Sequence, residues 1–375
     1  MGPKPPEAAT FEAVPDSVSL ILGLYKAQPI AYPLPRATVE RYGDQWWKPE
    51  HIVSNGAFRL VEFDPTHGLL ERNPDYFGEF PGNLDRFEWR SLDSDEELIH
   101  EYQAGHADIC EVTKSRDIPI EIPPNERFLR SQVLSTAGLV FIPTQPPLDD
   151  VRIRRALAYG LDRQKWMTII QGDSGARWLQ GGVVPPGMAG HSPELGLAFD
   201  LERARQLLAD AGYPGGKRFP QLKLASLPFP EARREFKRQF LDNLGIQIEI
   251  TDLPSDLPWW EEVKGDHMLT EAWAADYPDP ENFLRQSAFY LTLRNHGWHH
   301  SRYEQLIEEA TRTADRARRL TMYREADRIL VNDEVVVVPV FYGESQTELL
   351  KPWVKGYKEN ALGQFSLKNI IIEPH

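Results

Sequence analysis

The pattern that most restricts the fold lies in residues 200–250, where strand and helix signals alternate. Asp200 can cap a helix over 201–211, and the run Q-L-K-L-A-S predicts a strand. Residues 230–244 have the amphipathic spacing of a helix, and I-Q-I-E-I predicts the next strand. A strand, a helix and a second strand in this order form a crossover unit of a parallel sheet. We therefore expect an α/β fold.

Similar signals precede this unit. The start of residues 57–112 predicts a hairpin. Residues 87–112 then predict a strand, a helix that Ser94 caps and another strand, which we interpret as a strand–helix–strand unit. Residues 151–170 have the apolar spacing of one helix, with Asp149 or Asp150 as its cap. The α/β pattern thus covers much of the chain.

The last third of the chain adds strands and helices of the same kind. The run M-L-T-E-A-W-A-A predicts a strand that ends at Asp276, and residues 303–331 predict one long helix. Residues 335–342 are typical of a strand buried on both faces, although Pro339 lacks a backbone donor and so indicates an edge or a bulge. Residues 366–373 predict a final strand.

The size and charge of the chain limit its class. With 375 residues, 41% of them hydrophobic, the chain is long enough for two globular lobes with separate cores. Its net charge of −14 would repel a phosphate backbone, so nucleic acid is not an expected partner. The single cysteine, Cys110, excludes an intrachain disulfide and is expected to be a buried apolar residue. The start of the sequence lacks a signal-peptide pattern, and residues 17–24 are too short for a membrane span.

Motifs of catalysis and cofactor binding are missing from the sequence. His296, His299 and His300 lack the spacing of a zinc site, so we expect a solvated loop there. The run W-L-Q-G-G-V-V has neither the lysine of a nucleotide phosphate loop nor the glycine spacing of a dinucleotide fold. No nucleophile motif G-x-S-x-G occurs. We therefore expect no cofactor, no bound metal and no enzymatic activity.

One carboxylate is distinguished by its position. In the segment E-A-W-A-A-D-Y-P-D-P-E-N-F-L, Asp276 follows an almost apolar strand, three residues after Trp273, and Pro278 stops the strand. Ligands of open α/β sheets bind beyond the carboxyl ends of strands, so Asp276 is a candidate for an ion pair with a ligand ammonium. A turn aspartate that bonds its own backbone is one alternative. A hydrolytic carboxylate pair of Asp276 with Asp279 is another.

Several segments together resemble one protein family. They are I-V-S-N-G-A-F-R-L-V-E-F, L-L-E-R-N-P-D-Y-F-G, P-P-L-D-D-V-R-I-R-R-A-L-A-Y-G-L-D-R, W-A-A-D-Y-P-D-P-E-N-F-L, N-D-E-V-V-V-V-P-V-F-Y and L-L-K-P-W-V-K-G-Y. In sequence and in order they are similar to the family 5 extracellular solute-binding proteins, above all to the periplasmic oligopeptide-binding members. The resemblance implies a type II periplasmic-binding-protein fold, in which two α/β lobes close around a ligand cleft.

The same resemblance implies a function outside the cytoplasm. Such a protein captures peptides or similar solutes for an ABC importer, as a monomer without a cofactor. Its partners are the ligand and the membrane subunits of an ABC permease, at the periplasmic or extracellular face of the membrane. Two alternatives stay open, namely a ligand-sensing domain of a regulator and a carboxylate-dependent hydrolase.

The resemblance also implies a division into lobes. Lobe one would comprise residues 1–137, completed by residues 346–375, and lobe two would comprise residues 138–345. Members of the family begin with a longer N-terminal segment, so we expect a truncated form whose lobe one lacks early strands and is incomplete. A sheet without these strands would expose unpaired edges.

Residue roles follow from the resemblance as well. Asp276 would receive the α-ammonium of a peptide, and the strand that carries Ala272 and Ala274 would pair with the ligand backbone. Thr270 stands where oligopeptide binders carry an arginine that can meet the ligand carboxylate. The expected site residues are Asp276, Trp273, Ala274, Ala272, Thr270, Trp259 and Trp260, and Lys264, Arg285 or Arg294 are candidates to replace the missing arginine.

Overall fold

The structure, a computed structural model, describes residues 33–112, 127–171, 180–226, 229–253 and 263–375. Its α-helices are α2 (Arg36–Tyr42), α3 (Asp95–Gln103), α4 (Val151–Gly160), α5 (Arg163–Gln171), α6 (Leu201–Asp210), α7 (Pro230–Leu244), α9 (Ala288–Asn295), α10 (Ser301–Arg312) and α11 (Arg316–Arg328). Its strands are β1 (Phe58–Phe63), β2 (His67–Arg72), β3 (Arg86–Arg90), β4 (Ile109–Val112), β5 (Arg127–Phe141), β6 (Leu222–Ser226), β7 (Ile248–Asp252), β8 (Met268–Ala274), β9 (Val337–Leu350), β10 (Val354–Lys355) and β11 (Ile371–Ile372). The 3₁₀ turns are η2 (Gly43–Gln45), η3 (Pro214–Gly216) and η6 (Leu367–Asn369), and the π-helical turns are η4 (Asn282–Gln286) and η5 (Ile329–Asp333). Among the described helices, none combines the length and the apolar character that a membrane crossing requires.

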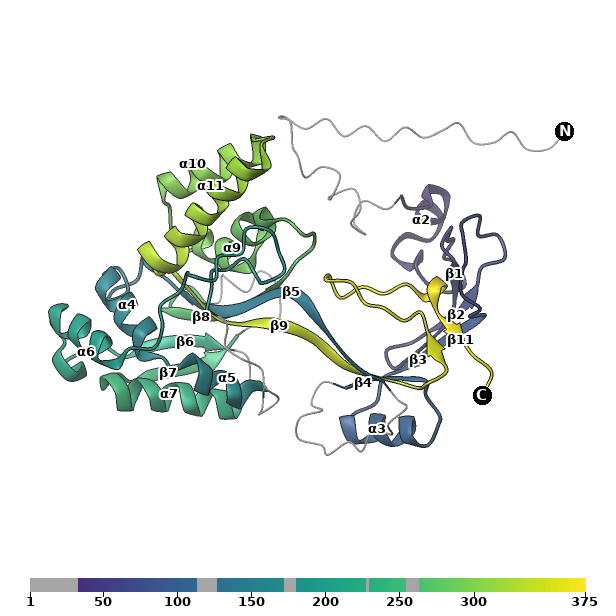
Figure 1. Ribbon diagram of the computed structural model, residues 1–375, viewed down its shortest axis with the longest axis horizontal. Helices are drawn as coiled ribbons and strands as arrows, with labels where there is room; N and C mark the ends of the chain where they lie inside the picture. The colour runs from purple at the N-terminus through teal and green to yellow at the C-terminus, as the bar shows by residue number, and fades with distance from the viewer. Residues whose placement is uncertain (1–32, 113–126, 172–179, 227–228, 254–262) are drawn as a thin grey trace.

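A mixed sheet of six strands forms the centre of the fold (Figure 1). Its strand order is β4-β9-β5-β8-β6-β7. Strands β6 and β7 run parallel, with Leu222 beside Ile248 and Ser226 beside Asp252, and α7 connects them. The crossover unit predicted from residues 200–250 is therefore confirmed, and so is the α/β class.

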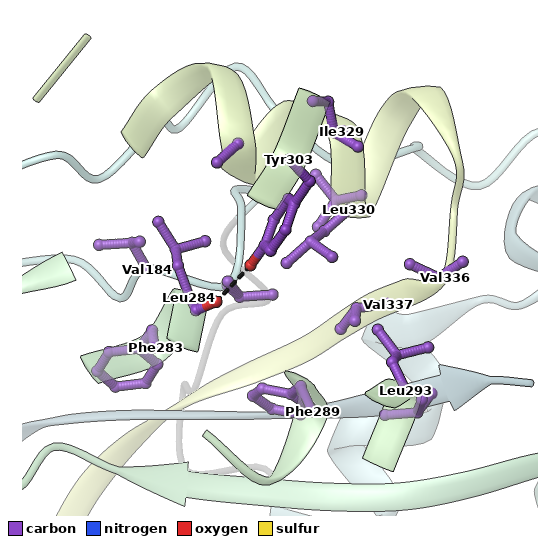
Figure 2. Close-up of a cluster of buried hydrophobic side chains, with 14 of the residues drawn as sticks. Val184, Phe283, Leu284, Phe289, Leu293, Tyr303, Ile329, Leu330, Val336 and Val337 are labelled. Carbon is purple, nitrogen blue, oxygen red and sulfur yellow. Dashed lines mark hydrogen bonds between the residues drawn. The ribbon is translucent and has the colours of Figure 1, made fainter. Parts of the chain in front are cut away.

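Helices cover both faces of this sheet. Consecutive side chains of a strand point to opposite faces. In β5 the buried residues Leu139 and Phe141 pack with helices α4 to α7, whereas Val140, and Ile142 just beyond the strand, pack with helices α9 to α11. Figure 2 shows part of the second cluster. Each large apolar side chain that is fully buried in this way contributes roughly 1.5–3 kcal/mol. The two clusters fix the position of the sheet between its helices.

Two long strands, β5 and β9, connect the larger part of the molecule with a smaller part (Figure 1). At one end Val140 lies beside Val337, and at the other end Arg127 lies beside Leu350, where β4 also pairs with β9. The register between the two strands shifts three times between residues 130 and 138. Such irregularities bend a strand and increase its twist. The connection between the two parts is therefore a pair of bent strands.

The smaller part contains the meander β1-β2-β3, helix α3 and the pair β10-β11. Asn83 joins the meander to the C-terminus, because its amide donates to Ile372 O (2.9 Å) and its Oδ1 accepts from Ile372 N (2.8 Å). Cys110 is buried beside α3, so the expectation of a small buried residue is confirmed. Burial raises the pKa of its thiol to about 11, which disfavours the reactive thiolate.

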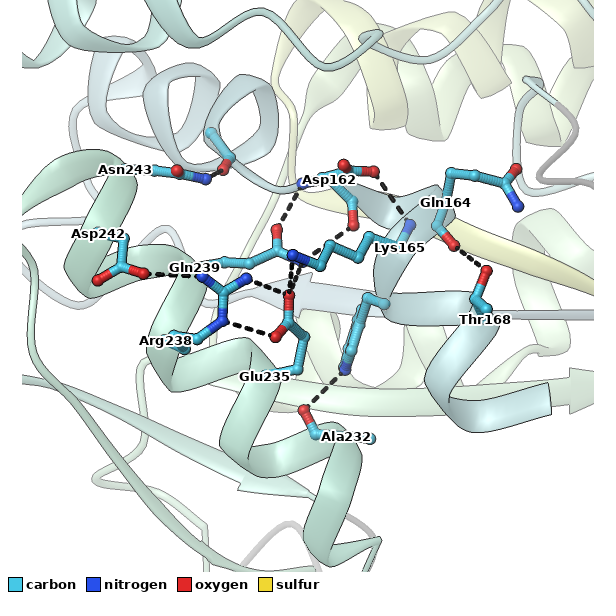
Figure 3. A network of polar contacts seen from close by, with 12 residues as sticks. Asp162, Gln164, Lys165, Thr168, Ala232, Glu235, Arg238, Gln239, Asp242 and Asn243 are labelled. Carbon is cyan, nitrogen blue, oxygen red and sulfur yellow. Dashed lines mark hydrogen bonds and ion pairs between the residues drawn. The ribbon is translucent and has the colours of Figure 1, made fainter. Parts of the chain in front are cut away.

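The single helix predicted for residues 151–170 is wrong, because two helices occupy this range. Asp162 begins a new helix, since its carboxylate accepts a hydrogen bond from Lys165 N (3.0 Å). Gln239 of α7 holds this break in place: its Oε1 accepts from Asp162 N (2.7 Å), and its Nε2 donates to Asp162 O (3.2 Å) (Figure 3). A side chain far along the sequence thus stabilises the break between α4 and α5, which the apolar spacing alone does not reveal.

The single helix predicted for residues 303–331 is divided in the same way. Helix α10 ends at Arg312, and Asp315 caps α11 by accepting a hydrogen bond from Arg318 N (2.9 Å). The end of α11 continues into the π-helical turn η5. A cap of this kind is worth about 1 kcal/mol, and it starts α11 after a short connection.

The strand–helix–strand unit predicted for residues 87–112 is also wrong as a unit. Its elements are present, and Ser94 caps α3 by accepting from Glu97 N (3.2 Å). However, β3 belongs to the three-stranded meander and β4 to the six-stranded sheet. The final strand predicted for residues 366–373 is reduced to β11, which pairs with β10 after the turn η6. Local patterns do not specify which strands pair.

The prediction for Pro339 is confirmed. In this stretch β9 pairs with β5, whereas β4 joins β9 only at residues 347–350, and the register of β5 shifts opposite the proline. Arg163 donates a hydrogen bond to Pro339 O (3.2 Å). The neighbouring strand is close, since a Cβ on Gly138 would lie 2.6 Å from Val338 O. The missing donor of the proline therefore falls where the sheet is irregular.

Candidate functional site

Strand β8 ends at the segment singled out in the sequence. It pairs with β5 along its length, from Met268 opposite Phe141 to Ala274 opposite Ser135. On its other side, the described pairs with β6 end at Leu269. Among the described residues, Ala272–Ala274 therefore have a strand partner on the β5 side only. A strand edge of this kind can pair with an added extended chain.

The two faces of β8 differ in character. Glu271 is buried and Trp273 is half-buried on the face that packs with α9, because alternate side chains share a face. On the opposite face Ala272 and Ala274 are exposed, and Thr270 is half-buried. The structure thus brings together Thr270, Ala272 and Ala274 on one face of a single strand. Small side chains there leave the backbone accessible.

Asp276 lies two residues beyond the strand and is exposed. The side-chain amide of Asn282, which is 0% exposed, donates to Asp276 Oδ2 (3.0 Å). The Oδ1 of the same amide accepts from Asp276 N (3.1 Å) and from Trp273 Nε1 (2.8 Å). Asn282 therefore joins two of the predicted site residues, Trp273 and Asp276. Asn282 was not among the predicted site residues, although it lies close after Asp276 in the run D-P-E-N-F-L.

The π-helical turn η4 carries Asn282 and is anchored by apolar residues. Phe283 and Leu284 are fully buried in the cluster of α9 to α11, and the hydroxyl of Tyr303 donates to Leu284 O (Figure 2). Ser287 then caps α9 by accepting from Tyr290 N. Single π-helical turns are rare and occur frequently at functional sites. The turn gives Asn282 a rigid base.

The other acidic residues of this segment have structural partners. Asp279, which is 4% exposed, forms an ion pair with Arg319 of α11 (2.6 Å). Glu281 is 1% exposed and accepts a hydrogen bond from Tyr277. Burial raises the pKa of Glu281 above its ordinary value. Asp276 is therefore exposed and bonded to Asn282, whereas Asp279 is buried and paired with Arg319. Two carboxylates with such different partners and exposure do not resemble a hydrolytic pair.

Glu271 is a buried acid within β8 and was not among the predicted site residues. Its Oε1 accepts a hydrogen bond from the hydroxyl of Thr292 on α9 (2.9 Å). Burial raises the pKa of Glu271 to about 7, because a low-dielectric surrounding disfavours the charged form. Glu271 thus connects β8 with α9 from the buried face of the strand.

The residues considered as replacements for the missing arginine have other contacts. Arg285 lies 3.8 Å from Glu281, and Arg294 forms an ion pair with Glu304 at 2.8 Å. Lys264 is exposed in the loop before β8. Trp259 and Trp260 lie outside the described residues.

The three histidines serve local structure. His300 accepts a hydrogen bond from Tyr303 N (3.1 Å) and so caps α10, and His299 lies 3.2 Å from Glu304. The Nδ1 of His296 lies 2.8 Å from Thr292 O. Within the described ranges, His, Cys, Asp and Glu side chains do not gather in groups of three that could hold a metal ion.

Comparison with curated proteins identifies relatives over almost the whole chain. The periplasmic oligopeptide-binding protein OppA of Escherichia coli (strain K12) is 26% identical over 98% of this chain and 69% of its own length. The "Probable deoxycholate-binding periplasmic protein YgiS" of the same organism is 27% identical over 93% of this chain and 66% of its own length. The chain thus spans about two thirds of the length of these relatives.

Solved structures share the fold. The murein tripeptide binding protein MppA of Escherichia coli superposes with a TM-score of 0.75 at 21% sequence identity, over 96% of this chain and 72% of the other. The type II periplasmic-binding-protein fold is therefore confirmed. The family described as "Bacterial extracellular solute-binding proteins, family 5 Middle" matches residues 5–290. With more than half of its length matched, the chain belongs to the family 5 bacterial extracellular solute-binding proteins.

Proposed function

We propose that this chain is the solute-capturing component of an ABC importer, and that its ligands are peptides or similar solutes with a free amino group. The observation that carries the proposal is the exposed carboxylate of Asp276, fixed by buried Asn282 at the end of β8. A fixed carboxylate can bind an ammonium group through a charge-assisted hydrogen bond.

The backbone of β8 supplies the second part of the proposed contact. Ala272 and Ala274 present small side chains, so an extended peptide can approach and add its backbone hydrogen bonds to the strand. Such contacts do not depend on the ligand side chains. Trp273 is a proposed wall of the site, and Thr270 is a proposed neighbour of the ligand. The names of OppA and MppA, which refer to oligopeptides and to a murein tripeptide, agree with this ligand class.

We propose further that the protein is a monomer without enzymatic activity and acts outside the cytoplasmic membrane with an ABC permease. A division at β5 and β9, with residues 138–345 as lobe two and residues 1–137 with 346–375 as lobe one, is supported by the register shifts of these strands near residue 137. Bent strands between two lobes are suited to a hinge. Small-angle X-ray scattering should then record a smaller radius of gyration when ligand is added.

The experiment that tests the ligand class is mass spectrometry of molecules released from the purified protein by denaturation. Short peptides of mixed sequence are the expected result, because backbone pairing accepts many side chains. Release of a steroid acid in place of peptides would overturn the proposed ligand class. Calorimetric titration of the emptied protein with tri-alanine then measures affinity directly, and slow turnover of tri-alanine would contradict the non-enzymatic role.

A further inference from the structure

Asn282 carries a buried side-chain amide that lies between two proposed ligand contacts, Trp273 and Asp276. Its Oδ1 accepts two hydrogen bonds, from Trp273 Nε1 (2.8 Å) and from Asp276 N (3.1 Å). Both of these partners carry hydrogen and can only donate. The oxygen of the amide must therefore face them, and the nitrogen must face the other way, because a reversed amide would place its own N–H groups against two donors.

This fixed orientation determines what the amide nitrogen does. The Nδ2 of Asn282 donates to Asp276 Oδ2 (3.0 Å). A hydrogen bond to an ionised carboxylate is stronger than one between neutral groups. The bond therefore holds the Asp276 side chain in one orientation, although the carboxylate itself lies at the surface.

Asn282 is held firmly enough to play this role. It is 0% exposed, and the next two residues, Phe283 and Leu284, are also 0% exposed. The bond from Tyr303 to Leu284 O ties the turn to α10. A side chain that packing holds in one rotamer can fix the position of the group bonded to it as accurately as ligand recognition requires.

We propose that Asn282 is a positioning residue that gives the site its specificity for ligands with a free amino group. It acts through Asp276, whose carboxylate it holds where the ligand ammonium binds. The inference rests on the proposed function. It predicts that loss of the amide weakens the contact with a ligand ammonium and leaves the contacts with the rest of the ligand unchanged.

The experiment compares two probes, tri-alanine and N-acetyl-tri-alanine, by calorimetric titration of the full chain. Wild-type protein should bind tri-alanine at least about 10-fold more tightly than the acetylated peptide, because hydrogen bonds to charged groups are the stronger ones. In Asn282→Ala this ratio should fall to about 2-fold or less. The affinity for the acetylated peptide should change less than about 2-fold.

Two further variants separate positioning from general damage to the fold. Asn282→Leu has the same branched skeleton without polar atoms, so it keeps the packing if the alanine variant proves too unstable to purify. The matched control is Asn332→Ala, because the Oδ1 of Asn332 also accepts from a backbone amide, Gly196 N (2.8 Å), but Asn332 belongs to the turn η5 rather than to η4. The control should retain the wild-type ratio.

The outcomes are distinct for the two proposals. A wild-type ratio near one would overturn the ammonium contact of Asp276 and with it the role of Asn282. A large wild-type ratio that survives in Asn282→Ala and Asn282→Leu would overturn the role of Asn282 alone. A double variant completes the test. In the presence of Asp276→Ala, the substitution Asn282→Ala should no longer change the ratio of the affinities for tri-alanine and N-acetyl-tri-alanine, because a residue that acts through Asp276 has no effect without it.

Discussion

Asn282 donates a hydrogen bond of 3.0 Å to the carboxylate of Asp276, six residues earlier in the chain. One of the two residues is fully buried and the other is exposed. The pair therefore connects the rigid apolar layer under β8 with a charged group at the surface. This arrangement differs from a flexible surface aspartate, whose side chain would lose entropy on binding a ligand.

Removal of the charge at Asp276 should weaken binding of free peptides. In Asp276→Asn we expect the affinity for tri-alanine to fall roughly 10- to 100-fold, because a charge-assisted bond becomes a neutral one. Calorimetric titration measures this change. Asp200→Asn is the matched control, since Asp200 caps α6 far along the chain and asparagine caps a helix equally well. Equal affinities of the two variants would contradict the prediction.

Glu271 should make the stability of the protein depend on pH. Burial raises its pKa to about 7 from an ordinary value of 4.5, so between these values the folded state holds a proton that the unfolded state has lost. Stability should therefore fall as pH rises from 4.5 to 7, by about 3 kcal/mol from this residue. Glu271→Gln should remove this loss and be more stable than wild type at pH 8.

Urea unfolding at pH 5 and at pH 8 measures the effect of Glu271. The glutamine can still accept the hydrogen bond from Thr292, so the variant changes the charge and keeps the contact. Glu309→Gln on the exposed side of α10 is the control and should retain the wild-type dependence. If Glu271→Gln loses as much stability between pH 5 and pH 8 as wild type does, the pH dependence does not come from Glu271.

The buried ion pair of Asp279 with Arg319 should be essential to the fold of this segment. Asp279→Ala leaves a largely buried guanidinium without its carboxylate, which costs about 3–5 kcal/mol. Loss of both partners in Asp279→Ala with Arg319→Leu should cost less than the sum of the single variants.

Thermal or urea unfolding checks the Asp279 prediction. The exposed pair of Arg302 with Glu325 on α10 and α11 is the control, because Glu325→Ala should cost less than about 1 kcal/mol. Similar costs for Asp279→Ala and Glu325→Ala would show that burial of the first pair has no energetic effect.

Glu235 should stabilise the protein at neutral pH and lose this effect in acid. Its carboxylate accepts two hydrogen bonds from Arg238 and one from Gln239 (Figure 3), and the arginine bonds lower its pKa below the ordinary value of 4.5. Because its pKa is lowered in the folded state, Glu235 contributes its full stabilisation above pH 4.5. This stabilisation is lost as the pH falls through the pKa that Glu235 has in the folded state. Glu235→Gln should cost about 1–2 kcal/mol at pH 7.

Unfolding of wild type and Glu235→Gln at pH 7 and at pH 3.5 tests this. The difference between the two proteins should shrink at the lower pH, because the unfolded wild-type chain then binds a proton at Glu235 that the folded state resists, whereas glutamine does not titrate. Arg238→Gln should remove most of the same effect, because Arg238 supplies the charge. A difference that stays constant with pH would refute the electrostatic explanation.

The sequence alone determined the α/β class, the crossover unit of β6, α7 and β7, and the place of Asp276 just beyond the end of a strand. It could do so because helix and strand periodicity, caps and a charge at the end of an apolar strand are local properties. Its errors concern helix breaks and strand partners. The break at Asp162 depends on Gln239, which is 77 residues away, and the separation of β3 from β4 depends on pairing with β2 and β9.

The candidate site divides in the same way. The order of residues placed Trp273 and Asp276 at the end of one strand, but it could not assign Asn282, Glu271 or Thr292 a role. Those roles depend on which groups meet in space: Asn282 reaches back across a turn, and Thr292 of α9 packs against β8. Sequence determines local conformation through short-range forces, whereas hydrogen bonds between distant segments form only when packing brings them together. The tertiary structure therefore decided which carboxylate is held at the surface and which are buried.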